Sequence, residues 1–90
     1  MQTTIKRLES IVSDINRIAK RPPTAYTRND ENKFIANLGN FHLAMQYQCY
    51  ELHEMFNSNG GIQVILYAKT KSEMEGKLLA FRAGLSTEKL

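Results

Sequence analysis

The sequence has one cysteine, two prolines and no tryptophan among its 90 residues. The single cysteine, Cys49, excludes an internal disulfide bond, and we expect it to be a small buried side chain, with a reactive thiol as the alternative. No apolar run approaches the roughly 20 residues that span a bilayer, and the N-terminus lacks the apolar segment of a signal peptide. We therefore expect a cytoplasmic protein without a membrane segment.

The composition is that of a soluble globular chain, with 42% hydrophobic and 23% charged residues. A chain of this length forms one domain with a thin core, so residues 1–90 are predicted to be a single domain. The net charge of +3 is compatible with nucleic-acid contact but does not require it. Basic residues are most frequent in the N-terminal third of the chain.

Residues 4–20 have the apolar spacing of an amphipathic helix, with steps of three and four between Ile5, Leu8, Val12 and Ile15. The prolines at positions 22 and 23 end this helix, because they lack an N–H donor and disfavour helical backbone before them. We expect the apolar stripe to pack on the domain's own core. A homodimer formed through this N-terminal helix is the alternative.

Residues 41–57 are predicted to form a second, central helix. Its apolar residues follow one another at steps of 4, 4, 3 and 4, and its composition favours a helix. Asn40 is a suitable N-cap, and Gly60-Gly61 supplies the positive φ that follows a helix end. A strand is the alternative, since Phe41, Leu43, Met45 and Tyr47 also alternate. The helical stripe comprises Phe41, Met45, Cys49, Leu52 and Phe56.

A third helix is predicted over residues 71–84, opened by a capping box at Thr70 and Glu73 and ended at Gly84. Two short strands are predicted over residues 33–38 and 62–68, and they pair with each other if the first forms. The sequence thus predicts a small α+β domain of three helices and one or two strands. A connector, residues 21–32, joins the first helix to a compact part, residues 33–85.

No pattern in the sequence indicates a catalytic site, a cofactor or a metal centre. The only histidines, His42 and His53, lie three turns apart on the predicted central helix and so cannot share a metal ion there. Gly60-Gly61 lacks the lysine and the helix start of a phosphate-binding loop. We expect a protein that is not an enzyme, and histidines that are polar groups at the edge of the core.

The connector and the end of the first helix combine positive charge, an aromatic ring and restricted backbone. Arginine offers a planar fork for carboxylate or phosphate, and tyrosine supplies apolar area with a polar tip. Such a surface suits a protein partner, or a nucleic acid whose bases stack on the rings. A solvated connector is the simpler interpretation. The predicted partner-binding residues are Arg17, Lys20, Arg21, Tyr26 and Arg28.

A further pattern extends over about residues 21–85. It comprises Asn37-Leu38-Gly39-Asn40-Phe41-His42-Leu43, Tyr47, Tyr50, Leu52-His53, Met55, Gly60-Gly61, Ala80-Phe81 and Gly84. This pattern resembles a group of small uncharacterised proteins encoded by bacteriophages and prophages. Where that group leads us to expect two glycines before the second tyrosine, this chain has Gln48-Cys49, which favours a continuous helix.

The resemblance implies a phage accessory protein that acts in the host cytoplasm. Small phage proteins commonly bind and inhibit a host protein or defence complex, such as a CRISPR effector or a recombination nuclease. We therefore expect a non-enzymatic inhibitor of a host protein. A nucleic-acid-binding accessory protein with a basic and aromatic surface is the alternative.

Overall fold

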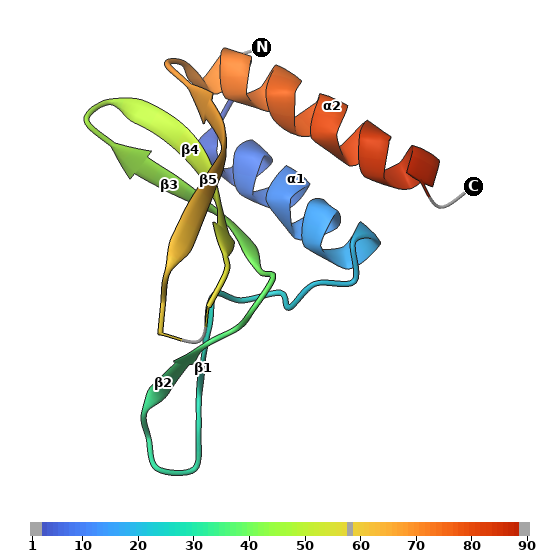
Figure 1. Cartoon of the computed structure of the whole chain (residues 1–90). Helices are drawn as coiled ribbons and strands as arrows, with labels where there is room; N and C mark the ends of the chain where they lie inside the picture. The colour runs from blue at the N-terminus through green and yellow to red at the C-terminus, as the bar shows by residue number, and fades with distance from the viewer. Residues whose placement is uncertain (1–2, 58, 89–90) are drawn as a thin grey trace.

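The structure, a computed structural model, describes residues 3–57 and 59–88. Within them the chain is a small α+β domain with two helices and five antiparallel strands in two sheets (Figure 1). The elements follow the chain in the order α1 (Ile5–Ile18), β1 (Tyr26–Arg28), β2 (Phe34–Ala36), β3 (Phe41–Gln46), β4 (Cys49–Met55), β5 (Ile62–Ala68) and α2 (Lys71–Glu88).

The larger sheet is a meander in which β4 lies between β3 and β5. Both helices pack on one face of this sheet, α1 against β3 and α2 against β5, and they also pack against each other (Figure 1). β1 and β2 form a separate hairpin that projects from one end of the meander. The other face of the meander has no helix over it in the described part of the chain.

The N-terminal helix is confirmed. Thr4 is its N-cap, and the Thr4 hydroxyl accepts a hydrogen bond of 3.1 Å from the Arg7 backbone N–H. The helix ends at Ile18, and Lys20 follows it with a φ of 59°. The predicted apolar stripe is buried inside the domain, with Leu8, Ile11 and Ile15 at 0% exposure. Burying this stripe is the main stabilisation of α1, because a 14-residue helix is marginal by itself.

The predicted central helix over residues 41–57 is wrong: this segment is the β3–β4 hairpin. Its register pairs Phe41 with Glu54 and Gln46 with Cys49. The two turn residues, Tyr47 and Gln48, have φ values of 51° and 64°, as a type I′ turn requires. The strand alternative at Phe41, Leu43 and Met45 was therefore the correct one. The described residues contain two helices instead of three.

The core lies between the meander and the helices. Phe41, Leu52 and Ala68 contribute from the three strands, and Met74 and Leu78 contribute from α2. The Phe41 ring meets the α2 residue Phe81 edge to face, with 5.4 Å between ring centres. Every second residue of a strand faces the helices, so the opposite side chains of β3, β4 and β5 share the face that no described helix covers.

The last helix begins where the capping box predicts. The Glu73 backbone N–H donates to the Thr70 hydroxyl at 3.1 Å, and the Glu73 carboxylate accepts from the Lys69 N–H. The predicted end at Gly84 is wrong, because α2 continues to Glu88, the last residue that the structure describes. Neither described helix combines the length and apolarity of a membrane span.

The strand predictions need one correction. Residues 62–68 form β5 as predicted, and β2 occupies the middle of the predicted strand 33–38. The two strands do not pair with each other: β5 pairs with β4, and β2 pairs with β1. The connector thus contains a strand. Gly60, at φ 88°, lies in the loop between β4 and β5 instead of after a helix.

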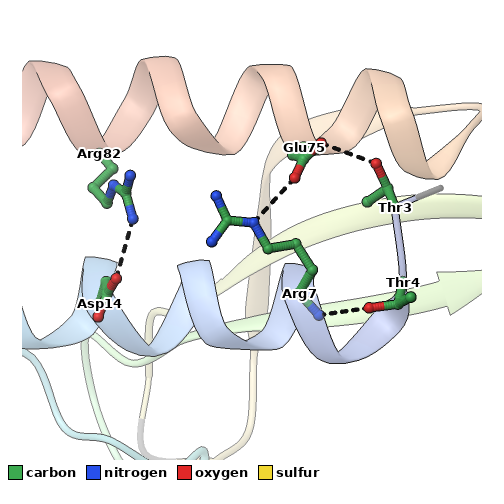
Figure 2. Close-up of polar contacts among 6 residues, drawn as sticks. All are labelled: Thr3, Thr4, Arg7, Asp14, Glu75 and Arg82. Carbon is green, nitrogen blue, oxygen red and sulfur yellow. Dashed lines mark hydrogen bonds and ion pairs between the residues drawn. The ribbon is translucent and has the colours of Figure 1, made fainter. Parts of the chain in front are cut away.

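Polar contacts hold the two helices together along their length (Figure 2). The Glu75 carboxylate accepts from the Thr3 hydroxyl at 2.9 Å and from Arg7 Nε at 3.1 Å. About one turn before the C-terminal end of α1, Asp14 accepts a hydrogen bond of 3.1 Å from Arg82 of α2. The pKa of Glu75 lies below its usual value, chiefly because of the Thr3 hydrogen bond. The pKa of Asp14 is also lowered, chiefly by Arg17 on the same helix and further by Arg82.

Candidate functional site

The β1–β2 hairpin is built by short ladder pairing and by two asparagine side chains. Its register pairs Tyr26 with Ala36 and Arg28 with Phe34. At the tip, the Asn29 side chain accepts from the backbone N–H groups of residues 31 and 33. At the base, the Asn37 amide donates to the Thr27 hydroxyl at 2.7 Å. The hairpin is therefore an ordered element with a defined pair of faces.

One face of this hairpin carries Tyr26, Arg28 and Phe34, which we call the hairpin face. The Tyr26 and Phe34 rings meet edge to face with 6.5 Å between their centres. The Arg28 guanidinium lies 4.8 Å from the centre of the Phe34 ring, a cation–π arrangement. Phe34 is nevertheless 66% exposed. The hairpin face thus presents aromatic area and a positive charge together.

The structure brings together two of the five predicted partner-binding residues, Tyr26 and Arg28. Arg17 lies on α1 and pairs with Asp14 at 3.1 Å, and Lys20 is exposed just beyond that helix. Arg21 is exposed, and its guanidinium bonds to groups at the end of the sheet. Arg17 and Lys20 thus lie at α1, apart from Tyr26 and Arg28 on the hairpin face, so the five residues do not form one surface.

Arg21 has a structural position. Its guanidinium donates to the Gly39 carbonyl at 3.2 Å and to the Glu54 carboxylate at 3.1 Å. It also lies 5.2 Å from the centre of the Phe41 ring. Replacing Arg21 would remove these contacts at the end of the sheet as well as any contact with a partner.

The residue that sequence reasoning missed is Phe34. The strand prediction for residues 33–38 left open whether Phe34 and Ala36 or Ile35 and Leu38 face inward. The alternation of apolar residues in this segment indicated a strand. Its partner strand β1 has only three residues and lies in a polar segment, so it gave no signal of its own. Without that partner, the pairing of Arg28 with Phe34 could not be foreseen.

Exposed apolar side chains continue from the hairpin onto the adjoining end of the meander. The Gly39 N–H donates to the Met55 carbonyl at 2.7 Å, which fixes the hairpin base to the end of β4. Tyr26 lies against Gly60, where an added Cβ would come within 3.1 Å of the hydroxyl. The large apolar residues exposed by 42% to 56% in this region are Leu38, Phe56, Ile62 and Val64.

The face of the meander that no described helix covers carries a histidine pair that the sequence did not predict, and His53 of this pair is 3% exposed. His42 and His53 are opposite each other in the β3–β4 register, with ring centres 5.4 Å apart. His53 Nε2 lies 2.7 Å from the Glu51 carboxylate, and His42 Nδ1 lies 3.1 Å from the Asn40 side-chain oxygen. The separation of three helical turns was therefore a wrong premise. No group of three His, Cys, Asp or Glu side chains in the described residues is arranged to hold a metal ion.

Asn40 sets the tautomer of His42. The Asn40 amide nitrogen donates to the Pro22 carbonyl at 2.8 Å, so its oxygen faces His42 and accepts from Nδ1–H. Partial burial, and then the neighbouring His53, hold the pKa of His42 below 6.5. Asn40 is thus a buried link between connector and sheet, and its predicted role as a helix N-cap is wrong.

Cys49 lies on the same face of the meander and is half-buried, instead of filling the core. Its sulfur lies 3.0 Å from the Tyr67 hydroxyl on β5. This contact is the main reason that the pKa of Tyr67 is raised above 10.

Comparison with known proteins adds no relative. The chain matches no protein-family model, no curated protein and no solved structure. The function is therefore argued from the chemistry of the exposed surfaces.

Proposed function

We propose that this chain is a non-enzymatic accessory protein of the bacteriophage type, which binds a host protein or defence complex and inhibits it. The observation that carries this proposal is the exposed hairpin face. A hairpin of two three-residue strands gains little from burial, yet it holds an aromatic ring at 66% exposure. Aromatic and arginine side chains of this kind are enriched at the centres of protein interfaces.

The neighbouring surface supports a protein partner. Leu38, Phe56, Ile62 and Val64 extend the apolar area around the hairpin base. Exposed apolar side chains in one region of a surface are typical of interaction sites. Assembly with a partner covers both the hairpin face and the end of the meander, and the Arg28 guanidinium supplies a donor for a carboxylate of that partner.

The test is affinity capture of partners from a bacterial lysate, with and without nuclease. We compare the native chain with a Tyr26→Ala, Arg28→Ala, Phe34→Ala variant. Arg21 is left in place because it bonds to Gly39 and Glu54. The matched control is Lys71→Ala, which removes one positive charge at the start of α2, far from the hairpin (Figure 1).

A host protein retained after nuclease treatment, lost with the hairpin variant and kept with the control supports the proposal. Inhibition is then measured on the purified host protein. Capture that the hairpin variant leaves unchanged contradicts it.

Nucleic-acid binding is the second candidate, favoured by the stacking of Arg28 on Phe34. A labelled single strand in a salt series distinguishes the two candidates. Affinity for nucleic acid falls steeply as salt rises, because phosphate contacts release counterions. An interface centred on aromatic side chains changes little with salt.

A further inference from the structure

β3 is an edge strand of the meander, and half of its backbone groups face away from β4. The Met55 N–H donates to the Asn40 carbonyl at 2.9 Å, which identifies Asn40 as a residue bonded to β4. In an antiparallel ladder such residues alternate along the strand. The N–H and C=O groups of Phe41, Leu43 and Met45 therefore point outward from the sheet.

At Phe41 the outward groups are satisfied by one side chain. Asn16 of α1 accepts from the Phe41 N–H at 2.8 Å and donates to the Phe41 carbonyl at 2.9 Å. This pair of bonds is the one that a neighbouring strand would make. Asn16 is 3% exposed, so this end of the edge is closed.

At Leu43 and Met45 no group among the described residues takes that position. The outer edge of the sheet at β5 provides a contrast, since the Lys77 ammonium donates to the outward carbonyl of Tyr67 there. Natural sheets usually protect a free edge with charge, proline or a covering element. Two successive outward residues of β3 are left without such protection.

A groove of about 300 Å³ lies beside this open edge, between α1 and β3. Its apolar walls include Ile5 and Val12 of α1, Pro23 of the connector, and Leu43 and Met45 of β3. Glu9 of α1 also lines it and has no ion-pair partner among the residues that the structure describes.

We propose that this groove binds a short extended peptide segment of a partner protein, which adds to β3 as a fourth strand of the meander. The peptide backbone bonds to the outward groups of Leu43 and Met45. Alternate apolar side chains of the peptide enter the groove beside α1, and a lysine or arginine pairs with Glu9. This is recognition by strand addition, in which backbone bonds give affinity and side-chain pockets give specificity.

Asn16 sets the length of the site. Because it already fills the pairing position at Phe41, a strand has room beside Leu43 and Met45 and beyond them toward the β3–β4 turn. This corresponds to about four residues. A second copy of the chain fits poorly in this site. Its β3 has six residues, and its own α1 would collide with the α1 of the first copy. The groove is separate from the hairpin face, so this inference does not depend on the proposed function.

The test uses purified protein and a displayed library of random heptapeptides. We expect enriched peptides with apolar residues at every second position and a lysine or arginine. These are then measured by fluorescence anisotropy against two variants. Met45→Pro removes one outward N–H and leaves the β4 ladder intact, because proline is tolerated at an edge position of this kind. Met45→Thr keeps the N–H and is the matched control.

We expect Met45→Pro to weaken peptide binding at least tenfold, and Met45→Thr to change it less than threefold. A second test changes the peptide instead of the protein. We compare two N-methylated peptides, one methylated at the odd-numbered backbone nitrogens and one at the even-numbered ones, and we expect one of the two to lose binding. With Glu9→Lys the selected peptides carry aspartate or glutamate instead of lysine or arginine. Bound peptide slows hydrogen exchange at the Leu43 and Met45 amides.

Three outcomes overturn the proposal. The first is a library that enriches no peptide above the protein-free control. The second is a peptide affinity that is reduced neither by Met45→Pro nor by N-methylation of either set of alternate peptide nitrogens. The third is a native dimer that Met45→Pro dissociates, which assigns the edge to a second copy of the chain.

Discussion

The imidazole rings of His42 and His53 meet edge to face across the β3–β4 ladder, with 5.4 Å between their centres. Glu51 faces His53, and the Asn40 amide faces His42. A positive charge on His42 would therefore be partly buried and would lie beside a second histidine. This arrangement favours neutral His42 in the folded chain.

The first prediction is that stability falls as the pH is lowered through 6.5. The folded pKa of His42 lies below its ordinary 6.5, because of burial and then His53. Between the folded and unfolded pKa the unfolded chain binds more protons, so acid favours unfolding. Urea denaturation at about pH 7.5 and about pH 5.5 measures the loss. His42→Gln should reduce this dependence, and an unchanged dependence in that variant would contradict the assignment.

The second prediction is that Leu52→Ala destabilises the fold by about 2–5 kcal/mol, since a fully buried leucine leaves a cavity. Leu52 is 0% exposed on the central strand. Thermal and urea unfolding measure the change. Val64→Ala, on a side chain that is 49% exposed, is the control and should have a much smaller effect. Equal effects of the two variants would show that Leu52 is not at the centre of the core.

The error at residues 41–57 has an identifiable physical cause. Phe41, Met45 and Leu52 lie on one face of the β3–β4 hairpin. The interval of four from Phe41 to Met45 and the interval of seven from Met45 to Leu52 match the spacing of one helix face, so the pattern imitates a helix. Cys49 and Phe56, the other members of the helical stripe, lie outside the core. The turn that separates the strands contains neither glycine nor asparagine, which are the residues that usually mark it. Local composition then favoured the helix, and tertiary pairing decided against it.

The third prediction follows from that turn. Tyr47→Asn with Gln48→Gly should raise stability by roughly 0.5–2 kcal/mol, because both positions have positive φ and the native residues are strained there. Calorimetry measures the melting temperature. Gln48→Ala is the control: it retains a Cβ at positive φ and should give no gain. A melting temperature that stays the same or falls in the double variant would count against a type I′ turn.

The fourth prediction concerns the closed end of the β3 edge. Asn16→Ala leaves the buried N–H and C=O of Phe41 without partners, which should cost about 1–3 kcal/mol. The exposed neighbour Ser13→Ala is the control and should be close to neutral. Hydrogen exchange at the Phe41 amide provides the direct measurement, and it should accelerate only in the Asn16 variant. Protection that survives Asn16→Ala would show that another group bonds to Phe41.

The sequence predicted the elements whose periodicity is strong and continuous. The α1 stripe and the β-branched run of β5 were found with bounds close to those observed. The candidate surface was found in part, because Tyr26 and Arg28 were visible in a connector but Phe34 joins them only through strand pairing. The bonds of Arg21 could not be predicted for a related reason: its partners, Gly39 and Glu54, lie 18 and 33 positions further along the chain.

The contact between the two helices also governs the order in which the fold can be completed. The Arg82–Asp14 and Arg7–Glu75 bonds each join groups 68 positions apart, whereas the meander is built from neighbouring hairpins. Nearby pairings close quickly, and distant ones pay a larger chain entropy. During synthesis the sheet can therefore assemble while α1 still lacks α2. Until α2 has emerged, the part of the apolar stripe of α1 that packs on α2 is open to chaperones and to other nascent chains.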